Sequence, residues 1–199
     1  GCVSLSEKTL RPGSPEDLPG CYAIFPSTPW ESVHKIEATI RGRGSSSLLG
    51  VTKGEPSERW LQSLLLAPEG FILFDAERRE SGITVRKAVA PFDSSAFAKG
   101  LMEDVALLFL PPQVKPTAWG KEIDGTMICE WEGPDESHTE ISGSMESGWR
   151  ILRRNRQGKV VKKVVLNGPF VNGLASRMEL RTFKPASYRL RMTLLQAFP

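Results

Sequence analysis

The chain has 199 residues and a formal net charge of +3, from 26 Lys and Arg against 23 Asp and Glu. This balance is mild, and the basic residues are not interleaved with aromatic ones, which argues against nucleic acid as a partner. Hydrophobic residues make up 40% of the sequence, and no run approaches the roughly 18 apolar residues that a membrane-spanning helix needs. The length suits one domain with a substantial core.

The chain begins Gly1-Cys2-Val3, which resembles the start of a mature bacterial lipoprotein, in which the Cys carries the lipid. Residues 4–20 are polar and rich in Pro, Gly and Ser, a composition that buries too little surface to fold alone. We therefore predict a lipidated tether over residues 1–27 and a folded domain over residues 28–199. The alternative is a truncation that happens to begin beside a Cys.

The other two cysteines, Cys21 and Cys129, belong to no CxxC pair and to no Cys/His group with metal-ligand spacing. This argues against a structural zinc site, and we expect neither a metal nor a cofactor. The two thiols could pair as a disulfide in an oxidising compartment. A buried free thiol at Cys129 is at least as consistent with the sequence.

The first half of the domain is predicted to be a helical turn followed by strands. Ser27 or Thr28 can cap a short helix over residues 29–34. Apolar and β-branched runs with short Gly- or Pro-containing linkers then predict successive antiparallel hairpins. The five predicted strands span residues 35–41, 46–52, 60–66, 71–75 and 83–87.

One long helix is predicted over residues 94–110. Phe97, Leu101, Val105 and Leu108 recur about every four residues and form one apolar stripe. Two consecutive prolines follow and end the pattern.

Six more strands are predicted after this helix, and several alternate between apolar and charged residues. One sheet with one apolar face must curl to hide that face, and the central helix can fill the concavity. The predicted fold is mainly β, an antiparallel half-barrel of about eleven strands wrapped on a central helix. The later strands span residues 127–132, 139–145, 149–154, 159–166, 176–183 and 188–197.

No catalytic constellation emerges from the sequence. The only histidines are His34 and His138, and the carboxylates around His138 fit a charged turn better than a general base. The sequence lacks a GxSxG elbow, a Walker loop, an HExxH motif and an EF-hand loop. We expect a protein that is not an enzyme.

A basic cluster lies in the second half of the chain. Two interpretations remain open: a solvated sheet face, or a surface that meets anionic headgroups. Its members are Arg150, Arg153, Arg154, Arg156, Lys159, Lys162 and Lys163.

Three local patterns resemble the LolB family of outer-membrane lipoprotein receptors and, more broadly, the LolA/LolB-like fold. They are LLLAPEGFILFDAE at residues 64–77, SGWRI at 147–151, and LASRMELRT with YRLRMTLL at 174–182 and 188–195. The resemblance covers residues 35–195. The N-terminal Cys2, the polar tether and the order of the predicted strands also agree with it.

The resemblance implies a hydrophobic cavity that holds lipid or the acyl chains of lipoproteins arriving from a periplasmic LolA-like carrier. It also implies a monomer attached by its lipid to the periplasmic face of the outer membrane of a Gram-negative envelope. Val3, the residue after the lipidated Cys, resembles the pattern of lipoproteins that are sent to the outer membrane. The alternative is a scaffold or assembly lipoprotein with a filled core. Each candidate cavity residue could instead be an ordinary core residue. The candidates are Phe71, Leu73, Phe97, Leu101, Met127, Trp131, Met178, Leu180, Leu190 and Met192.

The turn of the first pattern departs from the family. The resembled proteins carry an exposed Leu between the Pro and the Gly, which pushes cargo into the bilayer, whereas this chain has Glu69. A carboxylate is poorly suited to enter a membrane, because charged groups are costly there.

Overall fold

The computed structural model describes residues 11–40, 44–183 and 187–199. Its strands form a single antiparallel sheet, thirteen-stranded over these residues, in the order β1-β7-β8-β9-β10-β11-β12-β13-β2-β3-β4-β5-β6. The predicted mainly β half-barrel with a central helix is confirmed. The strands are β1 (Arg11–Pro12), β2 (Trp30–Ile40), β3 (Gly44–Glu55), β4 (Trp60–Leu66), β5 (Ile72–Arg79), β6 (Gly82–Ala88), β7 (Ala118–Lys121), β8 (Met127–Glu132), β9 (His138–Ser144), β10 (Gly148–Arg154), β11 (Val160–Val171), β12 (Leu174–Thr182) and β13 (Tyr188–Phe198).

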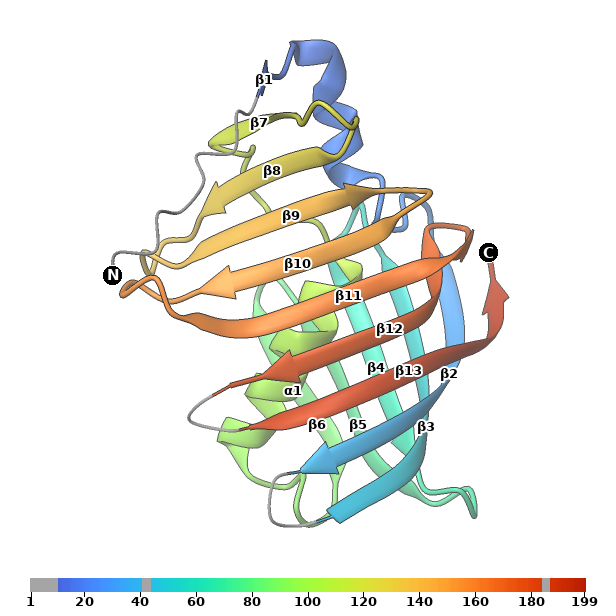
Figure 1. Cartoon of the computed structure of the whole chain (residues 1–199). Helices are drawn as coiled ribbons and strands as arrows, with labels where there is room; N and C mark the ends of the chain where they lie inside the picture. The colour runs from blue at the N-terminus through green and yellow to red at the C-terminus, as the bar shows by residue number, and fades with distance from the viewer. Residues whose placement is uncertain (1–10, 41–43, 184–186) are drawn as a thin grey trace.

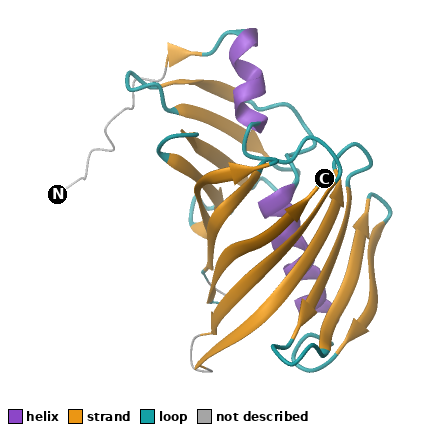
Figure 2. Ribbon diagram, turned by 90° about the vertical axis from the view of Figure 1, so that its right-hand side faces the viewer, coloured by secondary structure: helices purple, strands orange, loops and turns teal. Residues whose placement is uncertain are grey.

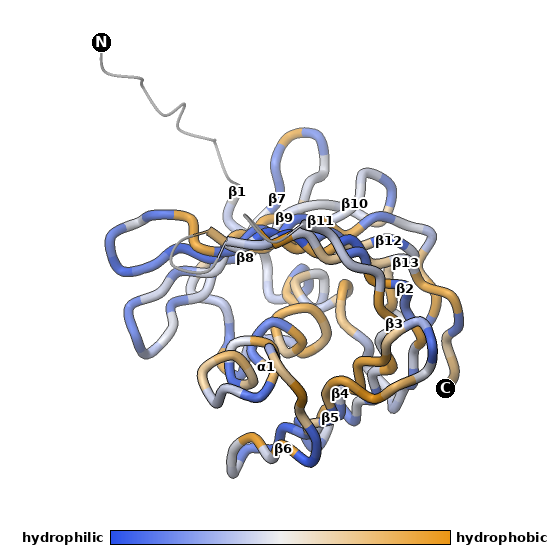
Figure 3. Tube along the Cα trace, turned by 90° about the horizontal axis from the view of Figure 1, so that it is seen from below, coloured by the Kyte–Doolittle hydropathy of each residue, from blue (hydrophilic) through white to orange (hydrophobic). Residues whose placement is uncertain are grey.

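The sheet curls around one long helix. Strands β8–β13 form one arm, the sheet bends through β2 and β3, and β4–β6 return behind it (Figure 1). Helix α1 (Ser95–Phe109) lies in the concavity between the two arms (Figures 2 and 3). The sheet remains open, because β1 and β6 form its two edges.

Helix α1 matches the helix predicted over residues 94–110. Ser94 caps it, because its hydroxyl accepts a hydrogen bond from the backbone N–H of Phe97 at 3.2 Å. The apolar stripe packs into the core, where Met102 and Leu108 are buried. Neither α1 nor any other helix of the described residues is both long and apolar enough to cross a membrane.

The predicted short helix at residues 29–34 is wrong. These residues open strand β2, in which Trp30, Ser32 and His34 alternate inward and are all buried. Strand β2 pairs along its whole length with β3 on one side and with β13 on the other. Pairing on both sides uses the backbone hydrogen-bonding groups of most of the segment, which outweighs the local capping signal at Ser27 and Thr28.

Part of the predicted tether packs onto the sheet. Strand β1 pairs with β7 at one edge, and the 3-10 helix η1 (Pro15–Tyr22) follows it. Cys21 is fully buried and forms a disulfide with Cys129 of β8, with the two Cα atoms 5.7 Å apart. The folded body therefore includes residues before the predicted boundary at 27/28, and the free-thiol alternative for Cys129 is wrong.

Strands β1 and β7 were not expected from the sequence. Strand β7 has only four residues and follows the two prolines after α1. It pairs with β8 through Trp119, which lies opposite Cys129. Trp119 also donates from Nε1 to the backbone oxygen of Ser14 at 2.9 Å, which fixes the N-terminal segment to the same edge.

Candidate cavity between the helix and the sheet

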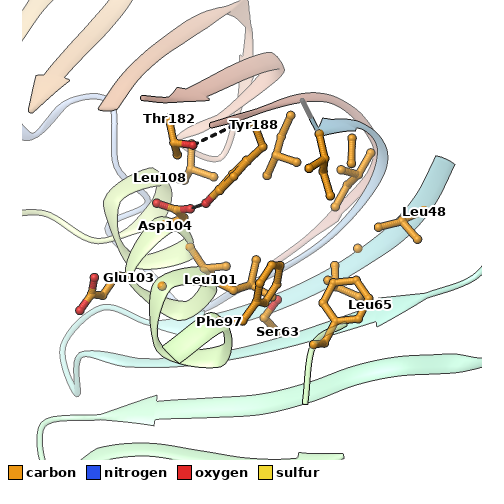
Figure 4. Close-up of a pocket in the computed structure, with 18 of the residues that line it drawn as sticks. Leu48, Ser63, Leu65, Phe97, Leu101, Glu103, Asp104, Leu108, Thr182 and Tyr188 are labelled. Atoms are coloured by element: carbon orange, nitrogen blue, oxygen red, sulfur yellow. Dashed lines mark hydrogen bonds between the residues drawn. The ribbon is translucent and has the colours of Figure 1, made fainter. Parts of the chain in front are cut away.

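A cavity of about 1320 Å³ lies between α1 and the bend of the sheet. Its walls come from α1, from β2–β5, from the ends of β11–β13 and from the segment before α1. Figure 4 shows Leu48 and Leu65 on the sheet side, with Phe97 and Leu101 pointing toward the cavity from the helix. The lining is mostly apolar because the inward positions of β2, β3 and β13 carry aliphatic residues.

An aromatic series joins the sheet to the first turn of α1 at this cavity. The rings of Phe74 and Phe92 lie 6.3 Å apart, and those of Phe92 and Phe97 lie 5.4 Å apart in an edge-to-face arrangement. Such pairs favour one relative orientation of their elements. The segment before α1 is therefore packed as part of the cavity wall.

The structure divides the predicted cavity residues into three groups. Phe71 lies outside the cavity and is 71% exposed at the hairpin tip. Met127, Trp131, Met178 and Leu180 are buried in the core and do not line the cavity. The residues brought together in the wall are Leu73, Phe97, Leu101, Leu190 and Met192.

The core group lies on the correct face of the sheet but outside its hollow part. Met127 and Trp131 belong to β8, near the edge covered by η1, where the edge-to-face contact of Trp131 with Tyr22 fills the space. Leu180 pairs with Leu190 of β13, yet only Leu190 reaches the cavity. Strand alternation thus identifies the dry face, whereas the sheet curvature decides which part of it is hollow.

Several wall residues were not predicted. Ile36 and Ala38 of β2 line the cavity, as do Leu48 of β3 and Tyr188 of β13. The alternation of Trp30, Ser32, His34, Ile36 and Ala38 was present in the sequence but was divided between a helix and a strand. Asp104 was missed because it is a charged residue on the apolar side of α1.

Asp104 joins α1 to the opposite arm of the sheet. Its side chain is 1% exposed, and its Oδ1 lies 2.5 Å from Nζ of Lys162 on β11. Tyr188 of β13 donates its hydroxyl to Oδ2 of the same carboxylate, and Figure 4 shows the two side chains pointing toward one another. Burial raises the pKa of Asp104, and the Lys162 ammonium partly opposes that rise. This polar cluster links α1 to the arm formed by β8–β13, at the wall of the cavity.

Breaking the polar cluster should weaken the fold. Asp104→Ala leaves Lys162 and Tyr188 without their carboxylate and is expected to lower the free energy of unfolding by about 2 kcal/mol. The loss is moderated because Lys162 is 18% exposed and can turn to water. Urea denaturation checks this, with Tyr188→Phe as the matched control and an expected loss of about 1 kcal/mol. If the losses in free energy of unfolding caused by Asp104→Ala and Lys162→Ala simply added in the double variant, this would contradict the pairing of the two residues.

A band of polar side chains lies at the other end of the cavity. Thr52 and Ser63 are buried in its wall and face each other across β3 and β4. His34 is fully buried beside them, and its ring lies 5.8 Å from that of Phe109. Burial lowers the pKa of His34 to about 4, so the ring is neutral near pH 7.

The histidines are not arranged for catalysis. His34 lies on β2, and its two ring nitrogens are buried without a hydrogen-bond partner in the described part of the chain. His138 begins β9, where it pairs with Glu132 and Arg154 in the ladders. Residues 11–40, 44–183 and 187–199 also hold no group of three His, Cys, Asp or Glu that could bind a metal ion.

The hairpin between β4 and β5 projects from the sheet. Its tip, Pro68-Glu69-Gly70, is fully exposed, and Gly70 adopts a φ of +88° that suits glycine. Phe71 follows directly, so one large exposed apolar ring stands beside the carboxylate of Glu69. Cys2, the predicted lipidation site, lies outside the described residues.

The comparisons with known proteins concern the fold. No family model matches the sequence, and no curated protein matches it. Several solved structures match, among them two that align over nearly the whole chain. One is a LolA superfamily protein from Nitrosomonas europaea, with a TM-score of 0.58 and 9% identity, over 92% of this chain and 91% of that one.

The second is a putative outer membrane lipoprotein-sorting protein domain from Vibrio parahaemolyticus. It has a TM-score of 0.54 and 8% identity, over 92% of this chain and 90% of that one. At such identities the likeness shows the fold alone. The chain therefore has a LolA/LolB-like fold, as the sequence patterns predicted.

Proposed function

We propose that this protein binds lipid or the acyl chains of lipoproteins in its cavity and acts as a receptor or transfer protein in the cell envelope. The observation that carries the proposal is the apolar cavity of about 1320 Å³. This volume exceeds the range of about 300–1,000 Å³ that is typical of small-ligand pockets. A filled core, which the scaffold alternative requires, does not fit such a space.

The energetics favour a flexible acyl ligand. Each buried CH₂ group contributes roughly 0.8 kcal/mol, so a long chain can bind through apolar contact alone. Met192 and the leucines of the wall can repack when the ligand leaves. A non-enzymatic carrier that releases its cargo needs this adaptability more than it needs directional hydrogen bonds.

The location is proposed on two supports. The Cys21–Cys129 disulfide fits an oxidising compartment, and the Vibrio parahaemolyticus neighbour is described as an outer membrane lipoprotein-sorting protein domain. We therefore propose a monomer on the periplasmic face of the outer membrane, anchored through lipidated Cys2 and supplied by a LolA-like carrier.

Gly100 offers a direct test of the cavity. It lies on α1, lines the cavity, and an added Cβ there would meet no atom within 4 Å. Gly100→Phe would place a ring in the space that an acyl chain needs, and we expect binding of a fluorescent fatty-acid probe to weaken about tenfold or more. A tenfold loss corresponds to the contacts that about two CH₂ groups of the acyl chain make with the cavity wall.

Gly100→Ala is the matched control. It removes a helix-interior glycine, so it should raise the free energy of unfolding by about 0.5–1 kcal/mol and leave probe binding unchanged. Native affinity in Gly100→Phe would show that the probe binds elsewhere. A native protein that binds no acyl probe would contradict the proposed function and favour the scaffold.

Glu69 bears on the last step of transfer. Glu69→Leu removes the charge beside exposed Phe71, so the tip should insert more readily into a bilayer. We expect a measurable gain in delivery of acylated cargo to vesicles, with Glu69→Gln intermediate between the native protein and the Leu variant. Equal delivery by all three proteins would show that the tip plays no part.

A further inference from the structure

The convex side of β10–β13 carries a cluster of basic side chains. Strand alternation sends Ile151, Val164 and Met178 into the core, so their neighbours along each strand point away from the cavity. This side of the sheet faces away from α1 (Figure 3). The residues that define this outer basic face are Arg150, Lys163, Arg177, Arg181, Arg189 and Arg191.

The strand register gathers three of these charges around the carboxylate of Glu179. Glu179 lies opposite Arg191, and Arg181 lies opposite Arg189 and Lys163. One oxygen of Glu179 is 2.5 Å from Arg181, and the other is 2.5 Å from Arg189 and 3.8 Å from Arg191. Glu37 of β2 lies opposite Arg191 but is ion-paired with Lys35 at 2.9 Å. Two carboxylates cannot neutralise three guanidinium groups and this ammonium, so the centre of this face keeps an excess of positive charge.

The protein itself already binds part of Arg150, whose guanidinium donates to Oε1 of Glu140 at 3.3 Å and to Oγ of Ser142 at 3.2 Å. The Nε atoms of Arg150 and Arg189 are buried, and neither has a hydrogen-bond partner within the described residues. Arg150 and Lys163 also line a shallow hollow of about 250 Å³ together with Asn167. The protein encloses these two Nε atoms, so the groups of this face that an anionic oxygen can reach are the exposed ones, such as the guanidinium groups of Arg181 and Arg191.

We propose that the outer basic face docks onto the anionic phospholipid headgroups of a membrane surface. Arginine forks match phosphate oxygens in a bidentate manner. The charges spread over four adjacent strands, as a lipid surface requires. No aromatic residue stands among the basic ones at the outward positions 150, 152 and 154, 163, 165 and 167, 177, 179 and 181, and 189, 191 and 193, whereas single-stranded nucleic acid needs stacking partners.

Docking through this face would leave the cavity accessible. The cavity is lined by inward residues of the strands, such as Leu190 and Met192, whereas Arg189 and Arg191 occupy the alternate, outward positions. A molecule lying on its convex side would therefore present the cavity to water, where a soluble carrier can reach it. The docking proposal depends on the outer face alone and stands apart from what the cavity binds.

Vesicle co-sedimentation of the full, unlipidated chain tests the proposal. We expect binding to vesicles that contain phosphatidylglycerol, little binding to pure phosphatidylcholine, and weaker binding as salt rises. Arg181 and Arg191 are 48% and 57% exposed, so Arg181→Gln with Arg191→Gln should preserve the fold. This double variant should bind phosphatidylglycerol vesicles about tenfold more weakly.

The control is Lys99→Gln with Lys115→Gln, which removes the same charge from exposed positions on α1 and the loop after it. It should bind as the native protein does, and both double variants should bind the acyl probe normally. If both double variants lost vesicle binding equally, the proposal would be overturned, because the attraction would then depend on net charge and not on this face. Absence of native binding to phosphatidylglycerol vesicles would also overturn it, even if inorganic phosphate or an acidic protein occupied the face.

Discussion

Reducing the disulfide between Cys21 and Cys129 is expected to lower the free energy of unfolding by about 4–5 kcal/mol. The bond links residues 108 apart in sequence, and a crosslink over about 100 residues removes this much chain entropy from the unfolded state. Both cysteines are fully buried, and they join η1 to β8. Urea denaturation with and without a phosphine reductant measures the difference.

A double variant separates crosslinking from packing. Cys21→Ala with Cys129→Ala should have a stability near that of the reduced native protein, and the reductant should not change it. Cavity binding should persist in both forms, because neither cysteine lines the cavity. A native protein whose stability is insensitive to reductant would contradict the crosslink.

His34 is expected to make the fold sensitive to acid. Burial lowers the pKa of His34 from 6.5 to about 4, so the unfolded chain binds a proton there before the folded one does. The contribution of the neutral ring is fully present above pH 6.5 and is lost as the pH falls toward 4. The shift corresponds to about 3 kcal/mol of stability.

The measurement is the free energy of unfolding of native protein and His34→Leu at pH 7 and pH 4. The native protein should lose about 3 kcal/mol more than the variant over this range. His138→Leu is the matched control, since His138 lies on β9 and is only partly buried, and it should retain the full acid loss of the native protein. Equal acid losses in native protein and His34→Leu would contradict the assignment.

The disulfide and the buried His34 both lie in segments whose structure the local sequence patterns predicted wrongly. Cys21 stood in a segment whose Pro and Gly content resembled a tether, and His34 stood in a segment with a helix cap. In both cases contacts with strands distant in sequence contribute to the conformation: β7 and β8 hold the first segment, while β13 pairs with the second. Local propensity cannot report partners more than a hundred residues away.

The sequence by itself determined the class of fold, because its information is periodic. Alternation in β12 and β13 defined a dry and a wet face, and the four-residue spacing from Phe97 to Leu108 defined the one long helix. The hairpin tip at Glu69 was also local, since Pro-Glu-Gly specifies a turn. These features depend on neighbours within a few residues.

Only the tertiary structure decided where the dry face is hollow and which charges meet. Leu180 and Leu190 lie opposite each other with the same periodicity, yet the curvature of the sheet buries one in the core and opens the other to the cavity. Lys162 and Lys163 are adjacent in sequence, but the pleat sends the first to Asp104 inside and the second to the outer basic face. Pairing across strands and the bend of the sheet are set by the whole chain, and so are the cavity and the surface opposite it.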